Sequence, residues 1–268
     1  MVDVVINYYN PQKSDLLFAQ TLYCILCYKR NKTNLVILSD GSGIVDERFL
    51  EYSKINDFVY LTSDKKLMFS EGYNMAVDYL ELYSKSEYIL LSANDIFVDI
   101  NTVELLSKNF DENCGCVIPY LSVSDLPIQN GIHNLKIRYP MGMTLNVNLF
   151  RRSDLIQIGK VPVELSGYFN DVVMFYKLKK IGKMIKLINA GKIIHLGKVT
   201  VSISSNASFE KDKRIFIEQF GECAPVNKYV NVKYSILAQT KFDYIISAVV
   251  DQIEIKWFTY FLLKLFKR

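Results

Sequence analysis

The feature that most constrains the fold is a regular alternation of short, apolar, β-branched runs with longer segments whose apolar residues recur at helical spacing. The first pair is a strand at residues 2–8 followed by a helix at 14–28. Further strands are expected at 35–38, 58–61 and 88–91, and further helices at 46–53 and 70–83. Continuous apolar strands that alternate with helices favour a mostly parallel α/β sheet with helices on both faces.

The second half of the chain follows the same plan less regularly. We predict helices at 101–110 and 171–181, and strands at 116–120, 143–150, 184–188 and 193–195. Residues 123–139 carry Pro, Gly, Asn and His and are expected to form a long loop, a frequent location of lids and binding sites. The expected organisation is one domain at 1–221 with a helical extension at 222–268.

Charge and cysteine content exclude several classes of protein. The net charge of +4 is spread along the chain, and no basic stripe interleaved with aromatics predicts a nucleic-acid partner. Residues 1–9 lack the features of a signal peptide, and five cysteines are an odd number in a chain large enough to fold without disulfides. We therefore expect a cytoplasmic protein.

A zinc site is the alternative explanation for the cysteines. It would combine Cys24 and Cys27 with Cys114 and Cys116. The first pair lies in a predicted helix, without the turn that zinc hairpins use, which favours buried free thiols.

Polar residues follow three of the expected parallel strands, at 7–10, 40–42 and 92–95. Open sheets of this kind bind their ligands at the carboxyl ends of the strands. These residues are therefore the first candidates for a functional site.

Six short segments carry motifs in a distinctive order: Val4–Asn10, Asp40-Gly-Ser42, Gly72-Tyr-Asn-Met-Ala76, Tyr88–Asp95, the region from Arg151 through Asp171 to Gly182, and Ile194-His195. In order and spacing they resemble the inverting family-2 glycosyltransferases, which have the GT-A fold. The resemblance covers about residues 2–220 and rests on several weak motifs together. It implies a Rossmann-like GT-A domain, followed here by a C-terminal helical tail.

The first motifs imply binding of a nucleotide-sugar donor. The implied contacts come from the loop after the first strand, the turn after the second, the helix beside the nucleotide pocket and the end of the fourth strand: Asn7, Tyr8, Tyr9, Asp40, Ser42, Gly72, Asn74 and Asn94. Taken alone, Asp40-Gly-Ser42 is equally an ordinary turn, because Asp and Gly suit turns on local grounds.

The resemblance also implies a divalent cation, Mn²⁺ or Mg²⁺, held by Asp95 and His195. Aligning Asp95 with the last acid of the family's Asp-x-Asp motif leaves Ala93 at the first position, so one carboxylate remains. Hard oxygen ligands with few protein contacts suit either metal. Asp95 as a turn residue and His195 as a buried strand-end histidine are the alternatives.

Asp171 falls where the family carries its catalytic base, with Asn170 in place of a common acidic neighbour. A positioned carboxylate can take the proton of an attacking hydroxyl. The alternative is a first-turn helix acid stabilised by the macrodipole. Arg151 and Arg152 are candidates to hold the donor phosphates or an ordinary surface pair, and His133 is a candidate acceptor contact.

Residues 242–268 are rich in apolar and aromatic side chains but contain no uncharged run long enough to span a membrane. Phe242, Ile246, Val249 and Ile253 recur at helical spacing. A helix with aromatics beside Lys264, Lys267 and Arg268 would lie at a bilayer surface, placing the protein peripherally on the inner face of a membrane. Packing on the core or on a second copy, as a homo-oligomer, is the alternative.

The sequence thus predicts an enzyme that moves one sugar from a nucleotide-diphosphate sugar, with UDP favoured, to a hydroxyl with inversion. The acceptor would be a glycan or a lipid-linked molecule, in surface polysaccharide or glycolipid synthesis. A non-catalytic nucleotide- or glycan-binding protein is the alternative, with the reduced acidic motif reflecting lost metal chemistry. No Gly-rich phosphate loop with a lysine supports a nucleotidyltransferase.

Overall fold

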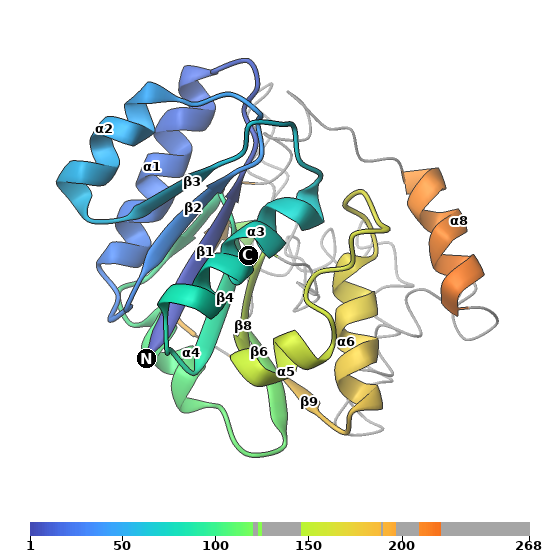
Figure 1. The fold of residues 1–268 in the computed structure, drawn as a ribbon. Coiled ribbons are helices and arrows are strands. Elements are labelled where there is room, and N and C mark those ends of the chain that lie inside the picture. Colours follow the sequence, from blue (N-terminus) through green and yellow to red (C-terminus); the bar gives the residue numbers. More distant parts are fainter. Residues whose placement is uncertain (120–122, 125–145, 189, 197–208, 221–268) are drawn as a thin grey trace, which may run out of the picture.

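A seven-stranded sheet forms the centre of the molecule in a computed structural model that describes residues 1–119, 123–124, 146–188, 190–196 and 209–220. The strand order is β3-β2-β1-β4-β8-β6-β9 (Figure 1). The strands are β1 (Val2–Tyr8), β2 (Val36–Asp40), β3 (Val59–Thr62), β4 (Tyr88–Ala93), β6 (Cys114–Pro119), β8 (Val147–Arg151) and β9 (Met184–Ile188). Only β8 runs antiparallel to its neighbours β4 and β6 in this sheet, so the mostly parallel α/β prediction is confirmed.

Helices cover both faces because successive strand residues point to opposite sides. Val4 and Ile6 of β1 join one apolar layer with helices α1 (Asp15–Lys29), α2 (Glu47–Asn56) and α4 (Thr102–Lys108). Val5 joins the other layer with α3 (Phe69–Tyr83), α5 (Arg152–Gln157) and α6 (Asn170–Lys180). Burying each large apolar side chain contributes about 1.5–3 kcal/mol, so the two layers hold the strand ends in fixed positions.

A small second sheet has the order β5-β10-β7, from β5 (Ile96–Val98), β10 (Ile193–His195) and β7 (Val123–Ser124). Strand β10 is antiparallel to β5 and places His195 opposite Ile96. The chain therefore returns after almost one hundred residues to the end of β4. The prediction of a loop at 123–139 is wrong for its first two residues, which pair with β10.

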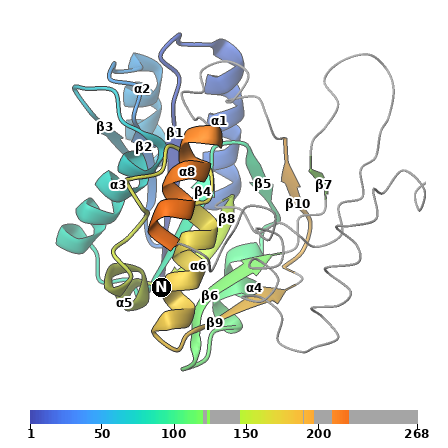
Figure 2. The same ribbon diagram turned by 90° about the vertical axis from the view of Figure 1, so that its right-hand side faces the viewer.

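Helix α8 (Phe209–Phe220) packs on α6 outside the two layers, as Figures 1 and 2 show. Its Phe216 is buried against Val172 and Val173 of α6. The sequence interpretation did not identify this helix or the short α5 and β5. The rest of the 123–139 loop with His133, the boundary at 221, Cys223 and the 242–268 segment lie outside the described residues.

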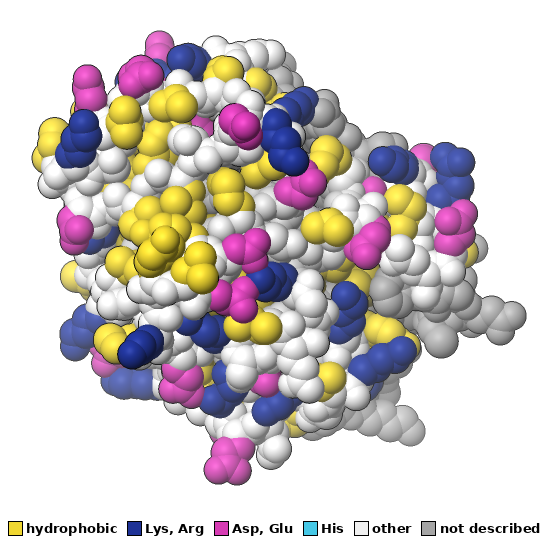
Figure 3. Space-filling view, in the orientation of Figure 1, with side chains coloured by type: hydrophobic (Ala, Val, Ile, Leu, Met, Phe, Trp, Pro, Cys, Tyr) yellow, Lys and Arg dark blue, Asp and Glu magenta, His cyan; other side chains and the backbone are white. Residues whose placement is uncertain are grey.

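Apolar side chains also reach the surface. In Figure 3 they gather on the face where α3 lies, and the exposed apolar residues of α3 include Leu82 and Tyr83. Among the described residues, no helix combines the length and the apolar character needed to cross a membrane.

Candidate active site

The predicted donor residues lie at the carboxyl edge of the sheet, and Asn7 and Gly72 meet there. Asn7 Nδ2 donates to the Phe69 carbonyl at 3.0 Å, at the start of α3. A Cβ on Gly72 would lie 2.4 Å from Asn7 Oδ1, so only glycine permits this approach. Ser39 Oγ donates to the Gly72 carbonyl at 2.5 Å. These contacts place α3 against the ends of β1 and β2.

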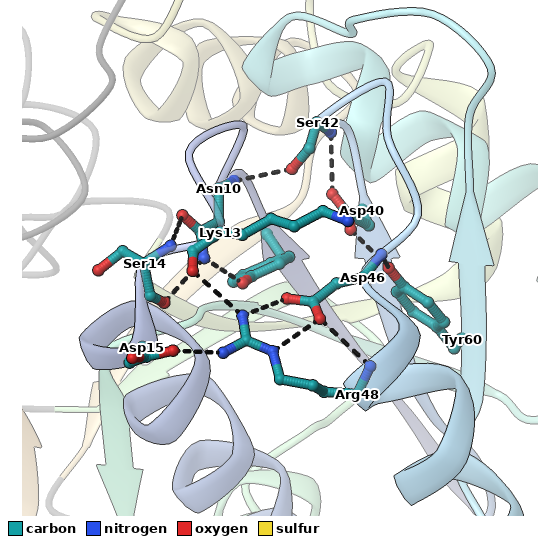
Figure 4. A network of polar contacts seen from close by, with 10 residues as sticks. Asn10, Lys13, Ser14, Asp15, Asp40, Ser42, Asp46, Arg48 and Tyr60 are labelled. Atoms are coloured by element: carbon teal, nitrogen blue, oxygen red, sulfur yellow. Dashed lines mark hydrogen bonds and ion pairs between the residues drawn. The ribbon is translucent and has the colours of Figure 1, made fainter.

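Asp40 ends β2 and is buried, with 1% of its surface exposed. Its carboxylate accepts the backbone N–H of Ser42 at 2.8 Å and the hydroxyl of Tyr60 at 2.7 Å (Figure 4). Burial raises the pKa of Asp40, and these hydrogen bonds oppose the shift. Ser42 Oγ in turn accepts the backbone N–H of Asn10 at 2.7 Å, so the loops after β1 and β2 form one unit.

Asn10 and Arg48 extend this network toward the helices (Figure 4). Asn10 Nδ2 donates to the Tyr8 hydroxyl at 2.7 Å, and Asn10 Oδ1 accepts the backbone N–H of Ser14. Tyr8 lies in the core, where burial raises its pKa. Arg48 donates to both oxygens of Asp46 at 2.7–2.8 Å. Arg48 also donates to the Lys13 carbonyl at 3.3 Å, so the loop after β1 is held from both sides.

Tyr9 follows the core residue Tyr8 and is only partly buried. Lys66 Nζ lies 5.0 Å from the centroid of its ring. Lys66 is brought there because its segment pairs with Ser42 and because Leu67 N donates to the Gly41 carbonyl at 2.9 Å. Sequence reasoning missed this cation, since no local pattern shows that residues 63–67 fold over the Asp40 turn.

Asn74 and Asn94 are both engaged within the fold. Asn74 exchanges two hydrogen bonds, at 2.9 and 3.0 Å, with the backbone of Val161. Asn94 is buried and donates to Thr21 Oγ1 at 2.9 Å, which ties the end of β4 to α1. Their predicted contacts with a nucleotide sugar, like those of the other donor residues, stay predictions.

Asp95 and His195 are brought together, as the resemblance implies. Asp95 Oδ2 lies 3.4 Å from His195 Nε2, with 5% of Asp95 exposed. Two backbone bonds fix the pair: Leu196 N donates to the Asp95 carbonyl at 3.1 Å, and Ala93 N to the Asn146 carbonyl at 2.8 Å. The Asn146 amide also lies 3.4 Å from His195 Nδ1, a partner that the sequence did not indicate.

The donor set of this pair fits Mn²⁺ or Mg²⁺. Mg²⁺ is often bound through only one or two carboxylates, with phosphate oxygens and water as its other ligands. In the part of the chain that the structure describes, no cluster of three or more His, Cys, Asp or Glu residues forms a larger site. Ligation through Nε2 requires the proton of His195 on Nδ1, and a rotated Asn146 amide would accept it.

Asp171 lies in the first turn of α6, 7% exposed, and its Oδ1 accepts the backbone N–H of Val172 at 2.8 Å. Helix α6 turns tightly at Gly182 into β9, which is parallel to β6. The helix therefore runs antiparallel to β9 and begins at the carboxyl edge, on the same edge as Asp40 and Asp95. The helix macrodipole favours negative charge at this position.

Arg151 and Arg152 do not lie at this edge, so their suggested role in binding donor phosphates is wrong. Because β8 is antiparallel, its last residue lies opposite Tyr88 at the start of β4. Arg152 forms an ion pair with buried Asp3 at 3.1 Å, and Arg151 with Glu87 at 2.6 Å. Both stabilise the opposite end of the sheet.

Four cysteines and two asparagines lie in the interior of the molecule. Cys24, Cys27, Cys114 and Cys116 are buried free thiols, as predicted. Asn148 of β8 and Asn170 of α6 are also buried, and neither amide has a hydrogen-bond partner within the described structure. An unpaired buried amide is destabilising by about 1–3 kcal/mol, and no sequence signal revealed these two.

Comparison with known proteins identifies the fold. No sequence model of a protein family and no curated protein sequence matches the chain. Among solved structures, TarS of S. aureus is similar, with 10% identity and a TM-score of 0.55 over 89% of this chain and 49% of that one. Its fragment 1–349 in complex with UDP-GlcNAc gives 11% identity and a TM-score of 0.55, over 92% of this chain and 79% of that chain.

A mannosyltransferase of Pyrobaculum calidifontis, in complex with GDP-Man and Mn²⁺, is also similar, with 13% identity and a TM-score of 0.53 over 95% of this chain and 80% of that one. The chain thus spans about half of the longer TarS structure and about four fifths of the other two. At these identities the likeness establishes the fold, which is the GT-A fold of glycosyltransferases.

Proposed function

We propose that this protein is an inverting glycosyltransferase that moves one sugar from a nucleotide-diphosphate sugar to a hydroxyl. The observation that carries the proposal is the pair formed by Asp95 and His195, 3.4 Å apart at the carboxyl edge of a GT-A sheet. Two segments one hundred residues apart converge there on a donor set suited to a diphosphate-bound cation. Solved structures of the same fold hold UDP-GlcNAc or GDP-Man with Mn²⁺, which supports this class of donor.

The residues at the carboxyl edge of the sheet would then have different roles in the reaction. Asp95 and His195 would hold Mn²⁺ or Mg²⁺, which supplies Lewis-acid neutralisation of the leaving diphosphate. The unit built from Asp40 and Ser42 would bind the base or ribose. Asp171 would accept the proton of the attacking hydroxyl, and direct displacement at the anomeric carbon gives inversion.

The donor and acceptor classes follow from the same proposal. We favour a UDP-sugar as donor and a glycan or lipid-linked hydroxyl as acceptor, in the synthesis of surface polysaccharide or glycolipid. Attachment to the inner face of a membrane through residues 242–268 would bring the protein to such an acceptor. Binding to anionic vesicles should disappear when these residues are deleted, and unchanged binding would exclude this role for the segment.

The test of the donor site is thermal stability in the presence of UDP, GDP, dTDP or CDP, each with and without Mn²⁺, beside an Asp95→Ala variant. A ligand that binds the native state selectively raises its stability. We expect a shift with one nucleotide that requires both Mn²⁺ and Asp95. No shift with any nucleotide, in a folded sample, would refute the donor site.

The second candidate is a non-catalytic protein of the same fold. The observation in its favour is that Asp95 is the one carboxylate left from the Asp-x-Asp motif, with Ala93 at the other position. Nucleotide binding without release of UDP or GDP from a panel of sugar donors would support this candidate. Turnover that depends on Asp171 would exclude it.

A further inference from the structure

A carboxylate of α8 binds the loop that precedes the proposed base. Asp212 is fully buried, and its two oxygens accept the backbone N–H groups of Ser166, Gly167 and Tyr168 at 2.9–3.0 Å. They also accept the hydroxyl of Ser166 at 2.9 Å. Three successive N–H groups that converge on one anion form a backbone nest. Here the anion comes from the chain itself, from a helix 46 residues away in sequence.

These hydrogen bonds are the main compensation for burying Asp212. Within the described residues, no lysine or arginine forms an ion pair with it. A buried carboxylate is strongly destabilising unless it is hydrogen-bonded. Hydrogen bonds to a charged acceptor are stronger than those between neutral groups, so the loop and α8 are firmly joined.

The next residue, Phe169, has a backbone conformation that needs such support. It precedes α6 with a φ of 65°, in the left-handed region, which is unfavourable for a residue with a side chain. Its ring is stacked on Phe216 of α8 at 4.9 Å and lies 5.4 Å from Phe209. Helix α8 therefore holds this residue by ring packing and the residues before it by Asp212.

Asp171 comes two residues after Phe169. Its place at the edge of the sheet depends on how the chain enters α6, and α8 fixes that entry at residues 166–169. We propose that Asp212 is a positioning residue for Asp171: it sets the base-bearing first turn of α6 through the Ser166–Tyr168 nest. This role rests on the proposed function, since it assigns the positioned group as the base.

The variant Asp212→Asn tests the role, because it replaces one acceptor oxygen with a donor group that faces backbone N–H groups. The assay is release of UDP from UDP-N-acetylglucosamine, or of GDP from GDP-mannose, with Mn²⁺ and water as acceptor. A displacement of about 1 Å in a catalytic group lowers rates about a hundred-fold. We expect kcat to fall about ten- to a hundred-fold with KM for the donor nearly unchanged, and the acidic limb of the pH–rate profile to shift.

The matched control is Asp154→Asn, a buried carboxylate of α5 that lies near Arg151 and Lys183 at the opposite end of the sheet. It should lower stability while leaving kcat and the pH profile unchanged. If Asp212→Asn also leaves kcat and the pH–rate profile unchanged, at a temperature where the variant is folded, the positioning role is overturned.

Hydrogen–deuterium exchange tests the positioning role of Asp212 independently of the proposed glycosyltransferase function. In Asp212→Asn, exchange should accelerate at residues 166–171, with the later turns of α6 still protected. Faster exchange confined to α8 would overturn the positioning role. If the wild-type protein releases no nucleotide from any donor, the proposed function fails, and the exchange result alone then decides whether Asp212 positions Asp171.

Discussion

Replacing Gly72 with alanine should destabilise this protein, although alanine is the better helix former. Gly72 lies in α3 where the helix passes the end of β1. The new Cβ would lie 2.4 Å from Asn7 Oδ1, whereas ordinary contact begins at 3.4 Å, so one of the two groups has to retreat by 3.4 − 2.4 = 1.0 Å. Asn7 is held in place by its 3.0 Å bond to the Phe69 carbonyl.

Three terms set the size of the effect. Overpacking is unfavourable by about 1–3 kcal/mol. Loss of the hydrogen bond from Asn7 to Phe69 removes about 0.5–1.5 kcal/mol. Alanine is more favourable than glycine inside a helix, so the replacement also stabilises α3 by about 1 kcal/mol. Gly72→Ala should therefore lower the free energy of unfolding by about 0.5–3.5 kcal/mol.

The assay is urea unfolding of the wild type, Gly72→Ala, Asn7→Ala and the double variant. Without the Asn7 amide the new methyl group has room, so on that background Gly72→Ala should be neutral or stabilising by up to about 1 kcal/mol. If Gly72→Ala lowers the free energy of unfolding equally, within about 0.5 kcal/mol, with and without the Asn7 side chain, the contact with Asn7 is not the cause of the destabilisation.

Two other substitutions probe the buried polar groups by urea unfolding. Asp46→Ala removes the N-cap of α2 and should lower stability by about 0.5–2 kcal/mol at neutral pH. Burial raises the pKa of Asp46, but the hydrogen bond and charge of Arg48 outweigh it, so the pKa lies below its ordinary value. The stabilisation is therefore complete above the ordinary carboxyl pKa of about 4 and is lost as the pH falls through the lowered pKa; an equal loss at pH 7 and pH 2 would contradict this reasoning. Asn148→Leu removes an amide without partners and should raise stability by about 1–3 kcal/mol, whereas a lower stability would show that the amide is satisfied in solution.

The sequence was sufficient to locate the edge of the sheet where the candidate site lies. Asp40 and Asp95 each follow a short apolar run, and the rule that parallel sheets bind ligands at their carboxyl ends placed them together. The order of the motifs also predicted that Asp171 and His195 lie at this edge. Hydrophobic periodicity alone gives no sign that these two residues lie near Asp40 and Asp95. The positions of these residues at the edge are confirmed because each residue lies in or directly after a strand or helix that the local pattern predicts, whereas their roles stay predictions.

The groups that the sequence did not reveal act through contacts between distant segments. Lys66 reaches Tyr9 because residues 63–67 fold over the Asp40 turn, and Asp212 reaches Ser166 from 46 residues away. Asn146 approaches His195 across 49 residues. A lysine after a strand or an aspartate in an amphipathic helix has an ordinary local explanation, so only the fold shows which of them lies beside the site.

The same long-range contacts bear on how the candidate metal pair works. Asp95 lies in the turn between β4 of the large sheet and β5 of the small one, His195 lies opposite Ile96 in the β5–β10 pair, and the core side chains Ile96 and Ile193 join this pair to the α1 layer. The distance between the two candidate ligands is therefore set by the pairing of β5 with β10 and by the backbone bond from Leu196 to Asp95, and both depend on how the small sheet packs against the α1 layer. Among the residues that the structure describes, no other His, Cys, Asp or Glu completes a cluster with this pair, so none of them could replace a ligand displaced by a change in that packing. Metal affinity at this site should thus respond to substitutions in the α1 layer that never touch the ion.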